Sequence, residues 1–330
     1  MTAYNLASLY NQSVQEESSE AFQTGFISEE SYKKILLSHP GTIYTPNYFI
    51  KIALGILTGV AVLFAAILMG LLFATGDSSQ VIALCIFLGI ACYASLELFI
   101  KKKNFYNAGV DNVLMASSII FIIGAFFVND LTTGYTLISG VSMLLCLYMC
   151  IRFTDAFMAI ISYLSFFMFI FLLYIKLGGI AKATAPFLLL ILSALVYFFM
   201  GNLIKRDKLI PYNFCMRSVM FLALVTFYAS ANYFVVTELS NQLFGLQSTI
   251  QDGIPFGWFF WIMTFVIPAG YIFYGITRKD LLFTRTGMGL SVAAVLTIRY
   301  YHAMLPIELV ILIAGVILIT ASYCLIQSLK

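Results

Sequence analysis

The chain is 330 residues long, 62% hydrophobic and only 10% charged, and its formal net charge is +3. Ordinary soluble domains are about 25% charged, so this composition excludes such a fold, and the small net charge gives no reason to expect a nucleic-acid partner. Repeated apolar stretches of about 20 residues instead predict an all-α, polytopic transmembrane helix bundle whose partners are membrane lipids.

Residues 1–48 are polar and predict a small cytoplasmic helical hairpin followed by a linker. Gly25 suits the left-handed residue that ends a first helix, and Ser28 suits the N-cap of a second. No apolar stretch stands near the start, so no cleavable signal peptide is expected. Two interpretations stay open. The hairpin is either a packing and anchoring element or a binding site for a cytoplasmic protein partner.

Residues 49–330 form the predicted transmembrane domain, with about ten spans in a window of about 19 residues. The expected spans are 49–74, 80–100, 112–129, 134–151, 156–175, 184–203, 212–238, 256–277, 281–299 and 303–325. The third, fourth and ninth are short or carry polar residues. A count of nine therefore stays open, and it would move the C-terminus across the membrane.

Basic residues gather in alternate connections between the spans, and this pattern predicts the orientation. The basic set is Lys101, Lys102, Lys103, Arg152, Lys205, Arg206, Lys208, Arg278, Lys279 and Arg285. The positive-inside rule places these connections, and with them both termini, in the cytoplasm. Trp258 and Trp261 begin the eighth span at the end assigned to the outer face, where amphipathic rings prefer to lie.

Arg299, His302 and Glu308 form a predicted polar group at the outer ends of the last two spans. A helix over residues 281–299 covers about 27 Å, close to the thickness of the hydrocarbon layer. One interpretation is interface anchoring, in which the arginine snorkels and Glu308 pairs locally. The other is an outward-facing polar vestibule, in which Arg299 and Glu308 pair and His302 titrates near neutral pH.

A second predicted polar group lies at the cytoplasmic ends of the spans, and its members are Glu97, Asp111, Arg152, Asp155, Arg217 and Arg285. Arg217 lies inside the seventh span and needs a partner there, and Asp111 or Asp155 enters at the same face. A structural clasp and a gate that opens when the pair breaks both fit this pattern. Glu97 stands four residues before Lys101, which is a favourable helical pair.

Two residues predict irregularity within the spans. Pro268, near the middle of the eighth span, frees a backbone carbonyl, and such kinks line cavities or act as hinges. Asn232 lies among small residues of the seventh span, where its amide can bond to another helix. If these two helices touch, their contact is the preferred location for an internal polar cavity.

The sequence predicts no catalytic residues, no metal site and no cofactor, so the protein is not expected to be an enzyme. It contains no phosphate-binding loop and neither of the common hydrolase motifs HExxH and GxSxG. Its two histidines hardly supply an acid–base set. The six cysteines all lie in apolar spans, where they are interpreted as small hydrophobic residues rather than as disulfides.

Residues 25–35, with the sequence GFISEESYKKI, resemble a group of uncharacterised bacterial multi-spanning membrane proteins that open with a similar short helical segment. The basic KKK at residues 101–103, followed by AGVDNVLMASSIIF, is similar to their second-to-third span region. The resemblance implies a bacterial inner membrane and no particular activity.

These patterns lead to two expectations about function. The first is a transporter or permease-like protein for a small solute or ion, on the grounds of the span number, the kinked eighth helix, and Arg217 and Glu308 as buried charges. The alternative is a non-transporting membrane scaffold or sensor that acts through its N-terminal hairpin. Substrate, coupling ion and oligomeric state stay open.

Overall fold

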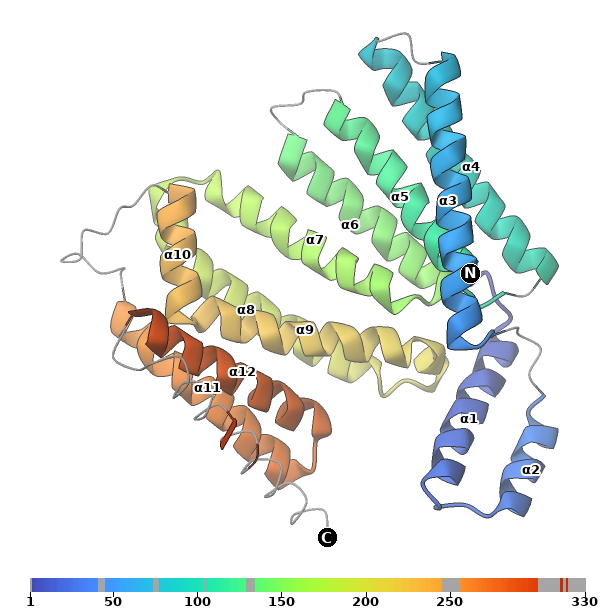
Figure 1. Cartoon of the computed structure of the whole chain (residues 1–330). Coiled ribbons are helices and arrows are strands. Elements are labelled where there is room, and N and C mark those ends of the chain that lie inside the picture. Colours follow the sequence, from blue (N-terminus) through green and yellow to red (C-terminus); the bar gives the residue numbers. More distant parts are fainter. Residues whose placement is uncertain are drawn as a thin grey trace. The chain divides into compact units, whose positions relative to one another are not determined.

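The computed structural model describes residues 2–40, 45–73, 77–103, 105–128, 134–244, 256–301, 315–316 and 319. Over these residues the elements are all helices, without a strand (Figure 1). Nine of the described helices are long and apolar enough to cross a membrane. The predicted all-α polytopic bundle is therefore confirmed. The tenth predicted span, residues 303–325, falls almost entirely outside the described residues.

The chain divides into two compact units, residues 1–169 with 204–216 and residues 170–203 with 217–330. The first unit contains α1 (Leu6–Gln23), α2 (Glu29–Ser38), α3 (Tyr48–Phe73), α4 (Ser78–Lys103), α5 (Val110–Val128), α6 (Gly134–Phe153), most of α7 (Ala156–Ile175) and the 3-10 helix η1 (Asp207–Tyr212). The second contains the end of α7, α8 (Gly179–Leu203), most of α9 (Asn213–Ala231), α10 (Tyr233–Phe244), α11 (Gly257–Arg278) and α12 (Leu281–Tyr301).

The N-terminal hairpin forms as predicted, from α1 and α2. Ser28 caps α2 by accepting the N–H of Ser31 at 3.3 Å. Gly25, between the helices, has the positive φ of 77° that a left-handed residue requires. The rings of Phe22 and Tyr32 stack with their centroids 5.0 Å apart, which holds α2 against α1.

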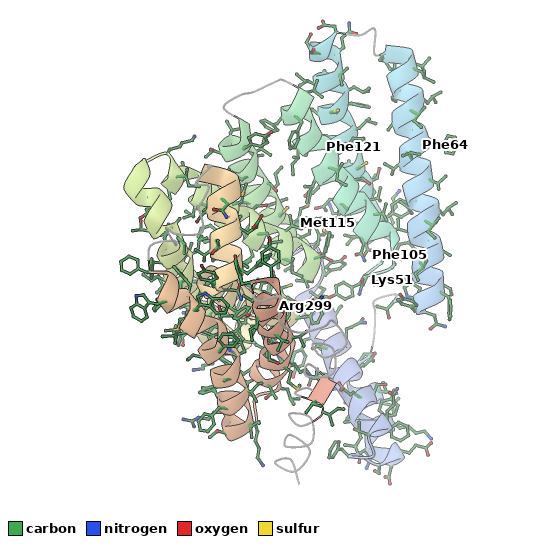
Figure 2. All side chains as sticks on the ribbon, turned by 60° about the vertical axis from the view of Figure 1, so that its left-hand side comes forward. Lys51, Phe64, Phe105, Met115, Phe121 and Arg299 are labelled. Atoms are coloured by element: carbon green, nitrogen blue, oxygen red, sulfur yellow. The ribbon has the colours of Figure 1, made fainter. Side chains whose placement is uncertain are left out.

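Close backbone contacts assemble the first unit. Ser118 of α5 is fully buried and donates its hydroxyl to the Gly89 carbonyl of α4 at 2.9 Å. Gly55 and Gly59 of α3 face Val113 of α5, in the small-xxx-small spacing that lets membrane helices approach closely. The remaining surface of α3 is open, and Figure 2 shows its side chains along the outer edge of the unit.

The loop before α5 docks against the start of α3. Asn107 and Gly109 both have positive φ, at 52° and 92°. The Lys51 ammonium of α3 donates to Asn107 Oδ1. A Cβ at Gly109 would overlap the Lys51 carbonyl oxygen, so only glycine fits this approach. Figure 2 labels Lys51 near Phe105, at the start of the same loop.

The second unit is built on a tight α11–α12 hairpin. Lys279 ends α11 in the left-handed conformation, and the Asp280 carboxylate accepts the N–H of Leu282 at 2.9 Å to begin α12. A Cβ at Gly275 would meet Thr284, so the two backbones nearly touch at the turn. A buried apolar cluster joins this hairpin to α8 and α9, and its members are Tyr228, Ala231, Ile267, Leu190, Phe227, Met263, Tyr271, Leu290 and Ala293.

Candidate functional site

The seventh predicted span is interrupted at Asn232, and this interruption is the centre of the candidate site. The continuous helix predicted over residues 212–238 is wrong, because α9 ends at Ala231 and α10 begins at Tyr233. Asn232 caps α10, since its Oδ1 accepts the N–H of Val235 at 3.1 Å. The side-chain oxygen of an asparagine can accept a backbone N–H that would otherwise bond within the helix, which favours a cap over a continuous helix. In Figure 1, α10 turns away from the axis of α9 at this point.

The side chain of Asn232 is 2% exposed and bonds to neighbours through both ends of its amide. Its Nδ2 donates to the Tyr228 hydroxyl at 2.8 Å and to Thr297 Oγ1 of α12 at 3.2 Å, so the amide does bond across helices. The N–H of Tyr233 donates to Thr264 Oγ1 of α11 at 3.0 Å. Tyr228, Asn232, Thr264 and Thr297 form what we call the polar junction, which ties α9 and α10 to both later helices.

Pro268 is buried in α11, and the helices that carry Asn232 and Pro268 do touch. Next to Pro268, Ile267 packs on Tyr228 and Ala231 in the buried cluster. The polar junction and this apolar cluster together occupy the contact at which the sequence suggests an internal polar cavity. A pocket among the described residues lies beside the junction, on the side of α8.

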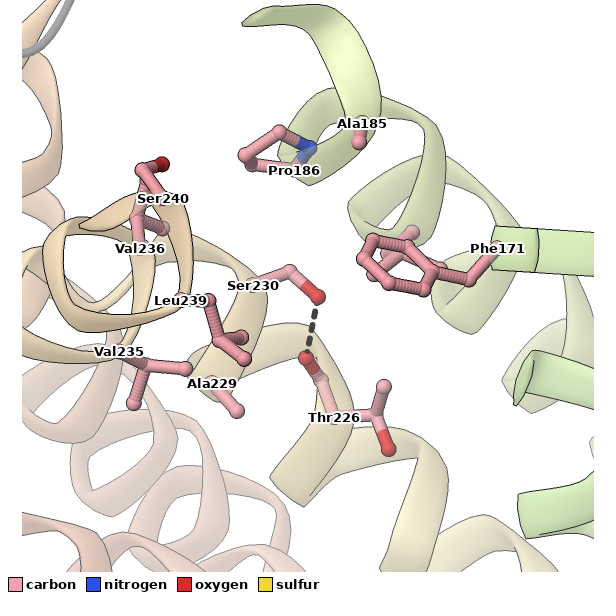
Figure 3. A pocket seen from close by; sticks show the side chains of 11 residues that line it. Phe171, Ala185, Pro186, Thr226, Ala229, Ser230, Val235, Val236, Leu239 and Ser240 are labelled. Atoms are coloured by element: carbon pink, nitrogen blue, oxygen red, sulfur yellow. Dashed lines mark hydrogen bonds between the residues drawn. The ribbon is translucent and has the colours of Figure 1, made fainter. Parts of the chain in front are cut away.

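A pocket of about 140 Å³ lies where α7, α8, α9 and α10 meet within the second unit. Figure 3 shows Pro186 of α8 across the pocket from Val236 and Ser240 of α10. The Ser230 hydroxyl donates to the Thr226 carbonyl at 2.7 Å. The lining consists of Phe171, Ala185, Pro186, Leu189, Thr226, Ala229, Ser230, Val235, Val236, Leu239 and Ser240, all of them uncharged.

This lining accepts an uncharged group of modest size. Apolar cavities of about 150 Å³ in proteins stay dry and bind benzene. Ser230 already donates within its own helix, and the amide of Asn232 is taken up by the polar junction. A bare ion in this pocket would lose its water without gaining charged partners from the lining, which is costly.

Aromatic rings cover the polar junction at the start of α11. Trp261 stacks on Tyr233 with centroids 4.9 Å apart, and Tyr301 meets Tyr233 edge-on at 5.0 Å. Trp258, one turn before, is 69% exposed. The sequence assigns this end of α11 to the outer membrane boundary, and rings of this kind prefer that depth.

The outer polar group predicted from the sequence is described only in part. Arg299 lies half-buried in the last turn of α12. A cation there interacts favourably with the negative end of the helix dipole. His302 and Glu308 lie outside the described residues. The vestibule and the pairing of Arg299 with Glu308 therefore stay predictions.

A charged cluster occupies one end of the first unit. The guanidinium of Arg152 in α6 bonds to the carboxylate of Glu97 in α4 at two points, 2.9 Å and 3.1 Å long. Tyr93 donates to the same carboxylate at 2.9 Å, and Lys101 stands 3.7 Å from it. The sequence suggests only the local pair with Lys101, because Arg152 is 55 residues away along the chain.

Asp111 and Asp155 serve as caps at the same end of the first unit. Asp111 is 2% exposed and accepts the N–H of Ala108 at 2.9 Å. Asp155 precedes α7 and accepts the N–H of Met158 at 2.8 Å. Burial raises the pKa of the Asp155 carboxyl, this hydrogen bond opposes the rise, and the charge of Asp111 adds to it.

Arg217 lies in α9 with an exposed side chain. By chain position it belongs to the second unit, whereas both aspartates belong to the first. The predicted clasp or gate between Arg217 and Asp111 or Asp155 would join the two units, and it stays a prediction.

Sequence reasoning missed the role of the first few residues. The N–H of Ala3 donates to the carbonyl of Arg152 at 2.8 Å. The Tyr4 side chain is 8% exposed and meets the ring of Tyr106 edge-on, with centroids 5.2 Å apart. An isolated tyrosine in a polar segment carries no pattern that would predict such burial.

Within the described part of the chain, no three His, Cys, Asp or Glu side chains are placed to hold a metal ion. Cys85, Cys92, Cys146, Cys150 and Cys215 are free thiols, and Cys324 lies outside the described residues. Comparison with known proteins adds nothing further, because no family model, curated protein or solved structure matches the chain. The resemblance to bacterial multi-spanning proteins stays an expectation.

Proposed function

We propose that the protein is a permease-like transporter for a small solute or ion in a bacterial inner membrane, with both termini in the cytoplasm. The observation that supports this proposal best is the span interrupted at Asn232, with a pocket beside the interruption. Broken membrane helices in transporters commonly lie at the substrate site. The uncharged lining favours a small uncharged solute over an ion at this position.

A break of this kind also supplies a movable element. Because Asn232 caps the first turn of α10, this helix begins independently of α9. It can therefore shift without unwinding α9. Hydroxyl and amide groups at the junction can exchange partners at low cost, since each hydrogen bond between membrane helices contributes only about 0.6 kcal/mol on average. Movement of α10 against α8 would open or close the pocket.

Liposome swelling tests the transport proposal. Vesicles that contain the protein are expected to admit glycerol or erythritol at least about tenfold faster than protein-free vesicles. Ala229→Phe should return the rate to background because its ring fills the pocket. Ala269→Phe is the matched control, since Ala269 is exposed on α11. Flux equal to that of empty vesicles, or undiminished flux in Ala229→Phe, would contradict the proposal.

The orientation is tested separately, by thiol labelling of Lys102→Cys in intact cells. A membrane-impermeant maleimide should label this position only after permeabilisation. Labelling from outside would overturn the proposed topology and with it the cytoplasmic location of both termini.

A membrane scaffold or sensor that acts through the N-terminal hairpin is the second candidate function. It is favoured by α2, which has no buried residue and exposes Leu37 to 83%. A protein partner bound to α2 would bury this apolar side chain, which is favourable. A photocrosslinker at Leu37 should yield an adduct in cells that one at Glu20, an exposed position on α1, does not. Identical adduct patterns at both positions would argue against this function.

A further inference from the structure

The N-terminal segment lies close to the buried carboxylate of Asp111 and the half-buried carboxylate of Asp155 in the first unit. Residues 2–5, which we call the strap, precede α1 and are tied to the end of α6 by the bond from Ala3 to the Arg152 carbonyl. Within the strap, the Thr2 hydroxyl donates to the Tyr4 carbonyl at 2.8 Å. Asn5 then caps α1 by accepting the N–H of Ala7 at 3.0 Å. The strap therefore has a defined path.

Tyr4 is the residue by which the strap covers the unit. Its ring is 92% shielded and packs edge-on against Tyr106 in the loop before α5. Burial raises the pKa of the Tyr4 hydroxyl, and the nearby charges of Asp111, Asp155 and, more weakly, Glu97 raise it further. The hydroxyl therefore stays protonated in the neighbourhood of these two carboxyl groups.

Few hydrogen bonds oppose removal of the strap, and the buried ring of Tyr4 is the main contact that holds it closed. Between the strap and the membrane helices, the Ala3 bond is the one backbone hydrogen bond found in the described chain. Further along, α1 buries Leu9 and Ser18, so the hairpin can remain docked while the strap leaves. Closing the strap also reduces the contact of the Asp155 carboxyl with water, which disfavours its ionised form.

We propose that the strap is a releasable cover over Asp111 and Asp155, and that its closure is linked to protonation of Asp155. The titratable groups near them are Lys51 of α3, Glu97 of α4 and Arg152 of α6, the thiols of Cys150 in α6 and Cys215 in α9, and the hydroxyls of Tyr4 and Tyr106. Glu97 and Arg152 are already paired with one another, and Lys51 donates to Asn107. Lys51 keeps its positive charge and partly offsets the effect of burial on Asp155.

The direction of the linkage follows from burial. Since burial in the closed form raises the pKa of Asp155, closure is most favourable below the ordinary aspartate pKa. It weakens as the pH rises through the raised value. By reciprocity, release of the strap promotes loss of a proton from the site. This device operates whether or not the second unit transports a solute.

Carbodiimide labelling of the full-length protein in detergent tests the cover. A water-soluble carbodiimide with glycine ethyl ester should modify Asp111, which is 2% exposed, at least tenfold faster in Tyr4→Ala than in the wild type. Tyr4→Phe should behave like the wild type because the ring, rather than the hydroxyl, excludes water. Tyr10→Ala is the control, since Tyr10 of α1 is 43% exposed. Equal labelling of wild type and Tyr4→Ala would overturn the proposal.

Hydrogen exchange tests the linkage and checks the fold of the variants. Protection of the peptide that contains the strap, corrected for the intrinsic exchange rate, should fall as the pH rises. Asp155→Asn should reduce this pH dependence while it keeps the cap of α7. An unchanged pH dependence in Asp155→Asn would refute the linkage. Loss of protection in α5 to α7 of Tyr4→Ala would mean that this variant is destabilised as a whole. The pH dependence of strap protection in Asp155→Asn, compared with wild type, then decides the proposal.

Discussion

The two units satisfy their polar side chains in different ways. In the first unit, charged groups gather at one end of the helices, where Glu97 and Arg152 form a two-point ion pair. In the second, the neutral amide of Asn232 lies within the helical bundle and bonds to hydroxyls of its own and other helices. Charges inside a membrane protein are costly and stay near an edge or a partner, whereas amides and hydroxyls are tolerated deeper.

Both units rely on glycine where two backbones meet, but the demands differ. Gly275 of α11 lies in a regular helix and must only leave space for Thr284. Gly109 must leave space for the Lys51 carbonyl and also adopt a φ of 92°. The loop of the first unit therefore depends on glycine for two independent reasons, and the hairpin of the second unit for one.

Gly109→Ala is expected to have the largest effect on stability. The substitution adds backbone strain to a steric overlap, which together should cost about 3 kcal/mol or more. Gly25→Ala is the matched control, because Gly25 also has positive φ but has no atom within 4 Å of its added Cβ. The midpoints of thermal unfolding in detergent compare the two. A Gly25→Ala variant as unstable as Gly109→Ala would remove the steric argument.

Asn232→Leu should destabilise the second unit by about 2–3 kcal/mol, because it removes the cap of α10 and leaves the Tyr228 hydroxyl without this partner. Asn202→Leu, an exposed change on α8, should leave the unfolding midpoint almost unchanged. Hydrogen exchange should locate the loss of protection in α9 and α10. Equal effects of both substitutions would mean that the polar junction contributes nothing specific.

Glu97→Gln should have a smaller effect, about 1–2 kcal/mol, since the pair with Arg152 is only partly shielded from solvent. Glu29→Gln breaks the exposed pair with Lys33 and should change the midpoint little. Added salt should reduce the difference between Glu97→Gln and wild type. A Glu97→Gln effect larger than that of Asn232→Leu would reverse the comparison between the units.

Local features of the fold could be predicted from local sequence. Ser28 and Gly25 mark the ends of the two hairpin helices because capping involves residues within one turn of each other. The break at Asn232 was missed because a small polar residue in an apolar run is compatible with either a continuous or a capped helix. The choice depended on Thr297 and Thr264, which α12 and α11 bring to it.

The candidate site was predictable in its residues rather than in its geometry. Asn232 and Pro268 are conspicuous as polar or helix-breaking residues in apolar spans, and their helices do touch. The pocket beside them is lined by ordinary apolar residues such as Val236 and Leu239. These residues look the same in sequence whether they face lipid, a neighbour or an empty space.

By itself, the sequence determined the membrane helices and their approximate ends, because in a bilayer each helix must satisfy its own backbone hydrogen bonds within a continuous apolar stretch. Only the tertiary structure decided which side chains meet. The pairing of Arg152 with Glu97, the burial of Tyr4 over two aspartates and the bond from Asn232 to Thr297 all join residues distant along the chain. Such contacts depend on which helices lie side by side, and hydrophobic patterning is nearly the same for every arrangement of helices in lipid.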